Sequence, residues 1–208
     1  MSKSQDIFTP MPHLTNEQVT DEALVKRSLQ HEDAFYSLMK RYEPVLLRYI
    51  NRMTKVSKEE AEDLLQEIFI KVYQNLNGFD SNLKFSTWVY RIAHNEIISH
   101  YRKNKQDRFT VELDADDKEV RSLSVFLTDT LNIESQFMNR EKSNAVRKAL
   151  GELPQKYQDI LVLHYFEDLS YSEISDILRK PPGTVATLLN RARAKFKKIA
   201  EQHKLESI

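Results

Sequence analysis

The sequence predicts an all-α protein made of two small helical domains joined by a flexible linker. Apolar residues recur in steps of three or four along much of the chain, and helix-capping patterns precede two of these stretches. The 208 residues include only 3 glycines, which disfavours glycine-dependent turns, phosphate-binding loops and dinucleotide fingerprints. At roughly 100–150 residues per domain, this length suits one large domain or two small ones.

Composition excludes several classes of protein. The chain has no cysteine, so it has no disulfide framework, no thiolate zinc site and no cysteine nucleophile. No apolar run approaches the ~20 residues that cross a bilayer, and the first residues lack the apolar core of a secretory signal. We therefore expect a soluble protein of the reducing cytoplasm, with no cofactor.

The first domain begins with a helix that contains Pro44, where we expect a kink. Its buried stripe is predicted to be Phe35, Leu38, Tyr42, Val45, Tyr49 and Met53. Another helix of this domain is expected from about Ser86 to Arg102.

Between these two lies a helix with a sharp start. Ser57 and Glu60 form a capping box, so the helix should run from Lys58 to about Leu76. Asn77-Gly78 is expected to end it in the left-handed conformation. Its predicted core stripe is Ala61, Leu65, Ile68, Val72 and Leu76.

The second domain is predicted to start with a helix at residues 134–150, which Gly151 and Pro154 interrupt. The next helix carries Tyr157, Ile160, Leu161 and His164. These two helices precede a more specific pattern.

That pattern is a helix-turn-helix. Ser170 and Glu173 make a second capping box, residues 180–183 break the chain, and Thr184 is expected to cap the last helix. The first helix of this pattern has a short apolar face that should be buried, formed by Ile174, Ile177 and Leu178. In the last helix the predicted core is Val185, Leu189, Ala192, Phe196 and Ile199, which leaves a basic outward face suited to phosphates.

The formal net charge is zero, but the charges are segregated. Residues 58–67 hold five acids and one lysine, whereas residues 179–198 hold seven cations and no acid. Residues 112–119 are acidic and aperiodic, which is typical of a linker. The expected organisation is a tail at residues 1–20, a domain at 21–103, a linker at 104–132 and a domain at 133–208.

The acidic helix at 58–76 presents a polar face opposite its core stripe. Ile70 stands on that face among Asp63, Gln66, Glu67 and Gln74. An apolar anchor among carboxylates fits a protein-docking face. An ordinary solvated face is the alternative, because surface apolar residues are common and acids complement a helix N-terminus.

Aromatic and basic residues are interleaved between Lys84 and Lys103. Single-stranded nucleic acid needs this combination, since bases stack on rings while cations follow phosphates. Phe85, Trp88 and Ile92 also fit a core stripe, so we expect at least one of these aromatic rings to be buried. The expected exposed contacts are Thr87, Arg91, His94 and Asn95.

An enzymatic function would need a catalytic constellation. Four acids on one helix, Glu59, Glu60, Asp63 and Glu67, are compatible with magnesium binding as in all-α nucleotide pyrophosphatases. No second acidic helix with matching spacing is found, and no Glu-x-x-His, Gly-x-Ser-x-Gly, His-Glu-x-x-His or Walker sequence occurs. We therefore expect a protein that is not an enzyme and holds no metal, with the pyrophosphatase as a distant alternative.

Five motifs occur in the order found in bacterial RNA polymerase sigma factors. They are RYEPVLLRYI, AEDLLQEIFIKVYQNL, FDSNLKFSTWVYRIAHN, ELPQKYQDILVLHYFEDLSYSEISDIL, and GTV followed by RAR. Over roughly residues 21–200 the sequence resembles the sigma-70 superfamily, in its short extracytoplasmic-function (ECF) class. The resemblance implies a non-catalytic subunit that binds core RNA polymerase, directs promoter-specific transcription initiation and helps to melt promoter DNA.

The resemblance also implies roles for three surfaces. Contact with the clamp helices of the polymerase's largest catalytic subunit falls on Asp63, Gln66, Glu67, Ile70, Lys71 and Gln74. Recognition and melting of the minus-ten element, with capture of a non-template base, falls on Asn77, Phe79, Lys84, Thr87, Trp88, Arg91, His94, Asn95 and Arg102. Reading of the duplex minus-thirty-five element falls on Ser172, Thr184, Thr187, Asn190, Arg191, Lys197 and Lys198. Family members are often held inactive by an anti-sigma factor, which is a further implied partner.

One departure from the family pattern concerns the recognition helix. Many members follow GTV with Lys-Ser-Arg, where this chain has Ala186, Thr187 and Leu188. The loss of two cations weakens phosphate attraction and direct base reading by the first turn of this helix. A stand-alone helix-turn-helix regulator is the remaining alternative, and it would bind duplex DNA without polymerase, as a dimer on paired half-sites.

Overall fold

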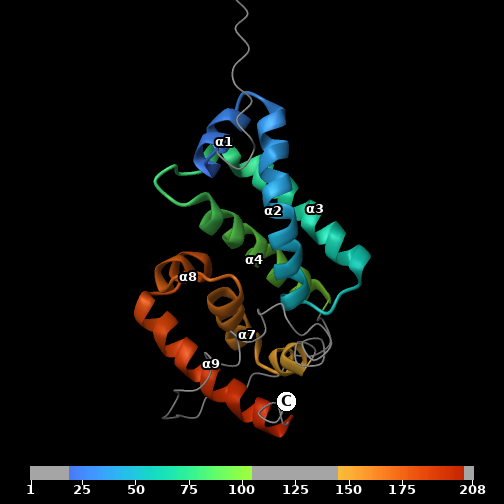
Figure 1. The fold of residues 1–208 in the computed structure, drawn as a ribbon, viewed down its shortest axis with the longest axis vertical. Coiled ribbons are helices and arrows are strands. Elements are labelled where there is room, and N and C mark those ends of the chain that lie inside the picture. The colour runs from blue at the N-terminus through green and yellow to red at the C-terminus, as the bar shows by residue number, and fades with distance from the viewer. Residues whose placement is uncertain (1–18, 105–144, 204–208) are drawn as a thin grey trace, which may run out of the picture.

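The computed structural model describes residues 19–104 and 145–203, and every regular element within these ranges is helical (Figure 1). The predicted all-α class is confirmed. The predicted linker apart from Asn104, residues 1–18 of the predicted tail and most of the predicted helix 134–150 lie outside the described residues. No helix in the described ranges combines the length and apolarity that a membrane span requires.

The first domain contains four α-helices and a 3₁₀ turn. They are α1 (Asp21–Ser28), α2 (Glu32–Met53), α3 (Lys58–Asn75), the turn η1 (Leu76–Gly78) and α4 (Phe85–Asn104). Sequence reasoning did not identify α1, although Thr20 followed by two acids signals its start. The Thr20 hydroxyl accepts a hydrogen bond from the backbone N–H of Ala23 at 3.2 Å.

The predicted stripes of α2 and α3 form the core of this domain. All five predicted positions of α3 are buried, and so are four of the six in α2, while Phe35 and Val45 are half-buried. Pro44 lies on the exposed side of α2, which continues through it to Met53. The capping box of Ser57 and Glu60 is confirmed.

The predicted left-handed end of α3 is wrong. No described glycine has positive φ, and α3 instead tightens into η1, where the Phe79 N–H donates to the Leu76 carbonyl at 3.1 Å. A 3₁₀ turn satisfies the last carbonyls without a left-handed residue.

The second domain contains helical residues 145–150, α7 (Gln155–Leu161), a π-helical turn η3 (Val162–Phe166), α8 (Tyr171–Leu178) and α9 (Pro182–Gln202). The capping box of Ser170 and Glu173 begins α8 as predicted. The predicted Thr184 cap is wrong, because α9 already begins at Pro182. Proline suits the first helical position, where its missing N–H costs nothing. The turn itself depends on Arg179, which has φ 51° and ψ 48°.

The two domains pack against each other, with α4 lying beside α8 (Figure 1). Polar side chains join them at a surface that we call the domain interface. Glu167 is its centre: the carboxylate side chain is only 4% exposed, Arg52 Nη1 lies 2.8 Å from one oxygen, and the Tyr90 hydroxyl donates to the other at 2.5 Å. Lys84 Nζ reaches Glu173 at 2.9 Å, and Gln158 Nε2 donates to the Arg52 carbonyl at 2.9 Å.

A second buried group at the domain interface is titratable. Asp159 Oδ2 lies 3.8 Å from His94 Nε2, and His94 Nδ1 lies 3.1 Å from the Tyr49 hydroxyl. Burial raises the pKa of Asp159 to about 7 and lowers the pKa of His94 to about 4. Both groups are therefore uncharged in the folded protein between these two values.

We expect Asp159→Asn to stabilise the protein at pH 8. The unfolded chain releases the Asp159 proton from about pH 4, so the wild-type free energy of unfolding should fall as the pH rises from about 4 to 7, in total by about 4 kcal/mol. The lowered pKa of His94 has the opposite effect on the free energy of unfolding. Above about pH 6.5 this histidine is neutral in both states, and as the pH falls from 6.5 toward 4 only the unfolded chain gains a proton, which destabilises the folded protein. In Asp159→Asn, Oδ1 still accepts the hydrogen bond from Gln155 Nε2, and the side chain no longer ionises. Burial of the neutral amide has a cost of its own, so a net gain of about 2 kcal/mol in the free energy of unfolding is expected.

Urea unfolding of both proteins at pH 5 and pH 8 checks this expectation. Asp159→Asn should gain over wild type mainly at pH 8. An equal difference at the two pH values would show that the carboxyl does not titrate in this range.

Candidate functional site

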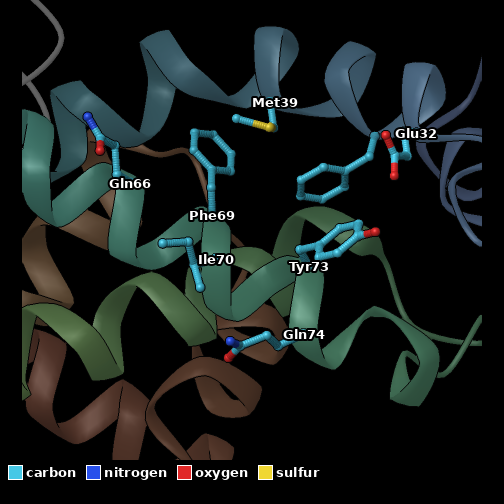
Figure 2. Close-up of a pocket in the computed structure, with 8 residues that line it drawn as sticks. Glu32, Met39, Gln66, Phe69, Ile70, Tyr73 and Gln74 are labelled. Carbon is cyan, nitrogen blue, oxygen red and sulfur yellow. The ribbon is translucent and has the colours of Figure 1, made fainter.

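A groove of about 730 Å³ runs between α2 and α3 (Figure 2). Its floor and walls are mainly aromatic and aliphatic, with polar groups at the ends. The lining residues are Glu32, Phe35, Met39, Gln66, Phe69, Ile70, Tyr73 and Gln74.

Ile70 lines this groove and is exposed as predicted, with 56% of its surface accessible. Asp63, Gln66, Glu67 and Gln74 are exposed on the same helix, so the predicted polar face exists. Lys71 is also exposed, but its Nζ lies 2.6 Å from Glu96 Oε1 and links α3 to α4. That ion pair makes Lys71 part of the helix packing as well as of the surface.

Sequence reasoning missed the contribution of α2 to the groove. Phe35 is predicted to belong to the core stripe, but it is half-buried and its ring lies 4.9 Å from that of Tyr73. Tyr73 is 49% exposed. It follows Ile70 by three residues and therefore lies on the same helix face. That spacing was the available signal for Tyr73, whereas Met39 is placed only by tertiary packing.

The predicted DNA residues of the first domain divide into exposed and buried groups. Asn77, Lys84, Asn95 and Arg102 are exposed, and Arg91 is half-buried. The expected exposure of Thr87 and His94 is wrong, because they are 7% and 8% exposed. Both lie on α4, the helix that packs against the second domain, and periodicity within one domain does not show such packing.

The aromatic residues of this segment form a cluster in the core. The Phe79 ring lies 5.5 Å from Phe85 and 5.3 Å from Trp88, both of which are buried. The expectation that at least one of the two predicted core aromatics is buried is confirmed for both. Trp88 is therefore not a free stacking platform in this arrangement.

The outward face of the helix-turn-helix is largely as predicted. Ser172, Thr184, Thr187, Asn190, Lys197 and Lys198 are exposed, and Arg191 is half-buried. The Thr187 hydroxyl donates to the Gly183 carbonyl at 2.9 Å, and Lys197 Nζ lies 3.9 Å from Glu201. Leu188, one of the departures from the family pattern, packs half-buried against the core. A cationic side chain at position 188 would have to lie against these apolar residues.

Within the described ranges, no group of three or more histidines or acids comes close enough to hold a metal ion. The acids of α3 that the pyrophosphatase interpretation would need are spread over an exposed face. The described fold and surfaces therefore define a two-domain helical protein with a mainly apolar groove in its first domain and a helix-turn-helix in its second.

Comparison with known proteins identifies both domains. Residues 38–106 match the family model of sigma-70 region 2, and residues 143–196 match that of sigma-70 region 4. The chain is 36% identical over 185 residues to the ECF RNA polymerase sigma factor SigW of Bacillus subtilis, covering 85% of this chain and 97% of that protein. It is 34% identical over 190 residues to the RNA polymerase sigma-H factor of Pseudomonas aeruginosa, covering 90% and 96% of the two chains.

Solved structures show the same fold. CnrH, solved in complex with the cytosolic domain of CnrY, superposes with a TM-score of 0.63 at 21% identity, covering 88% of this chain and 97% of that chain. The sigma factor RpoE of Bartonella quintana, solved with the anti-sigma factor NepR, gives 0.57 at 20% identity, covering 80% and 96%. The chain belongs to the sigma-70 family of RNA polymerase sigma factors, in the ECF class, and acts in promoter-directed transcription initiation.

Proposed function

We propose that this sigma factor docks on core RNA polymerase through the groove between α2 and α3. The observation that carries the proposal is the exposed Ile70 at a mainly apolar groove, with Asp63 and Glu67 exposed on the same helix. Buried apolar anchors supply most of the energy of an interface, while a charged rim selects a partner of opposite charge. A basic helical element of the polymerase fits this description.

The minus-ten element is the proposed ligand of α4 and of the turn before it. Asn95 and Arg102 remain exposed along the same helix for contacts with a melted strand.

Reading of the minus-thirty-five element is assigned to the exposed face of α9. The names of the two promoter elements place them about 25 base pairs apart, which is roughly 85 Å of duplex at about 3.4 Å per step. In this structure α4 and α8 are in contact. The domains must therefore separate before both elements are engaged, so the packed arrangement corresponds to the protein away from the promoter.

The protein is proposed to make no covalent bonds itself and to act in the cytoplasm, where RNA polymerase works. RpoE of Bartonella quintana was solved with the anti-sigma factor NepR. A regulatory partner of the same class is proposed for this chain.

Run-off transcription tests the function directly. The purified protein is added to sigma-free core polymerase from the same organism on fragmented genomic DNA, and the transcript starts are mapped. Discrete starts that share upstream sequence are expected. Tight operator binding by a dimer, without polymerase binding, would instead support the stand-alone regulator.

A further inference from the structure

A pocket of about 760 Å³ lies at the domain interface, where the C-terminal end of α2 meets the start of the second domain. We call it the interdomain pocket. The first domain contributes Arg48, Asn51, Arg52, Thr54, Lys55 and Val56, and the second contributes Arg147, Lys148, Gly151 and Gln158. Five of these ten residues are cations and none is an acid.

Among the described residues, one of the five cations forms an ion pair within 4.0 Å. Arg52 is held by Glu167 and lies over the Phe166 ring at 4.8 Å. Within residues 19–104 and 145–203, Arg48, Lys55, Arg147 and Lys148 make no ion pair within 4.0 Å. The nearby Glu152 carboxylate lies 2.9 Å from His203 Nε2, and after that contact the charges of Lys148 and Lys55 also lower the pKa of Glu152. Converging cations repel one another, so an anion that enters the pocket gains the attraction of all four, although Lys55 and Lys148 are partly offset by Glu152.

The backbone and neutral side chains of the pocket do not oppose an anion. The carbonyls at the end of α2 would repel negative charge. Three of them already accept hydrogen bonds from pocket side chains: Leu47 from Asn51, Ile50 from Thr54, and Arg52 from Gln158. These bonds use the neutral donors on the walls and leave the cations to face the ligand.

Gly151 allows Lys55 to reach across from the first domain. A Cβ at position 151 would lie 2.9 Å from Lys55 Cε and 3.1 Å from Lys55 Nζ. Any larger residue would therefore displace the Lys55 side chain. The close approach brings a cation of the first domain next to Arg147 and Lys148 of the second.

We propose that the interdomain pocket binds a small oligophosphate, such as a nucleoside triphosphate or an inorganic polyphosphate. Arginine forks and lysine ammonium groups are the side chains that bind phosphate oxygens, and the lining of the pocket supplies both kinds and no carboxylate. A concave pocket of this volume takes a small molecule. Because both domains contribute cations, the bound anion joins them and favours the packed arrangement.

Isothermal titration with inorganic triphosphate at constant ionic strength tests the proposal, without polymerase or DNA. Saturable binding of one triphosphate per chain is expected, with affinity at least tenfold lower for Arg147→Ala/Lys148→Ala and about threefold lower for Gly151→Ala. The matched control is Lys26→Ala/Arg27→Ala, an exposed Lys-Arg pair on α1 outside the pocket, which should bind as wild type does. A parallel titration with ATP distinguishes a nucleotide from inorganic polyphosphate by its relative affinity.

Three results would overturn it. Binding that Arg147→Ala/Lys148→Ala leaves unchanged would place the anion elsewhere. Equal binding of sulfate at the same ionic strength would show general screening of charge. A short single-stranded DNA that binds more tightly and displaces triphosphate would make the pocket a nucleic-acid surface.

Discussion

Ile70→Asp should weaken binding to sigma-free core polymerase by roughly 30-fold to 1,000-fold. Loss of a central anchor in an interface costs about 2–4 kcal/mol, and a carboxylate placed in an apolar contact also has to be desolvated. The fold itself should tolerate the change, since the side chain is 56% exposed and surface substitutions usually stay within about 0.5 kcal/mol. Fluorescence anisotropy of labelled protein against core polymerase measures the affinity, and thermal unfolding measures the stability.

Leu29→Asp is the matched control. Leu29 is 49% exposed at the end of α1 and does not line the groove, so the same change there should leave core affinity unchanged. If Ile70→Asp binds core polymerase as tightly as Leu29→Asp does, the groove between α2 and α3 is not the docking site.

Local sequence patterns predicted the helices because the signals that create them are local. The capping boxes of α3 and α8 lie within four residues each, and the predicted stripe of α3 is buried at every position. The end of a helix is less predictable where two backbone conformations can both close it. The end of α3 could be closed either by a left-handed glycine or by a 3₁₀ turn, and Asn77-Gly78 alone does not select between them.

The candidate surfaces were predictable only as far as one helix decides exposure. Ile70 follows from the periodicity of α3 alone, and its exposure is confirmed. Thr87 and His94 face outward within the periodicity of α4, but this helix also packs against the second domain. The contacts that join the domains, such as Arg52 with Glu167, link residues 115 positions apart, and no periodic pattern encodes them.

The composition of the contacts between the two domains has a physical consequence. The domain interface buries a carboxylate with an arginine and a tyrosine, and a second carboxyl beside a histidine, next to an apolar cluster that includes residues of both domains. Buried polar pairs depend on geometry and contribute less net stability than apolar packing of similar volume.

Locking the domains together should abolish transcription. The chain has no cysteine, so Lys84→Cys/Glu173→Cys introduces two unique thiols at an interdomain ion pair of 2.9 Å. A short bismaleimide with a cleavable disulfide spacer can then join α4 to α8. The cross-linked protein cannot span the roughly 85 Å between the two promoter elements, so run-off product should vanish and return after reduction. Recovery in the same sample separates the effect of the cross-link from that of losing Lys84, a predicted DNA contact.

The comparison with a cross-link inside one domain decides the cause. Lys40→Cys/Glu43→Cys places the same reagent across an ion pair of 3.2 Å within α2, where it restrains no domain movement. This protein should stay active with the cross-link in place, because only the interdomain cross-link opposes separation. Full activity of the cross-linked Lys84→Cys/Glu173→Cys protein would mean that α4 and α8 remain together on the promoter. In that event the minus-ten and minus-thirty-five assignments of the two domains could not both hold, because helices in contact cannot reach both elements at once.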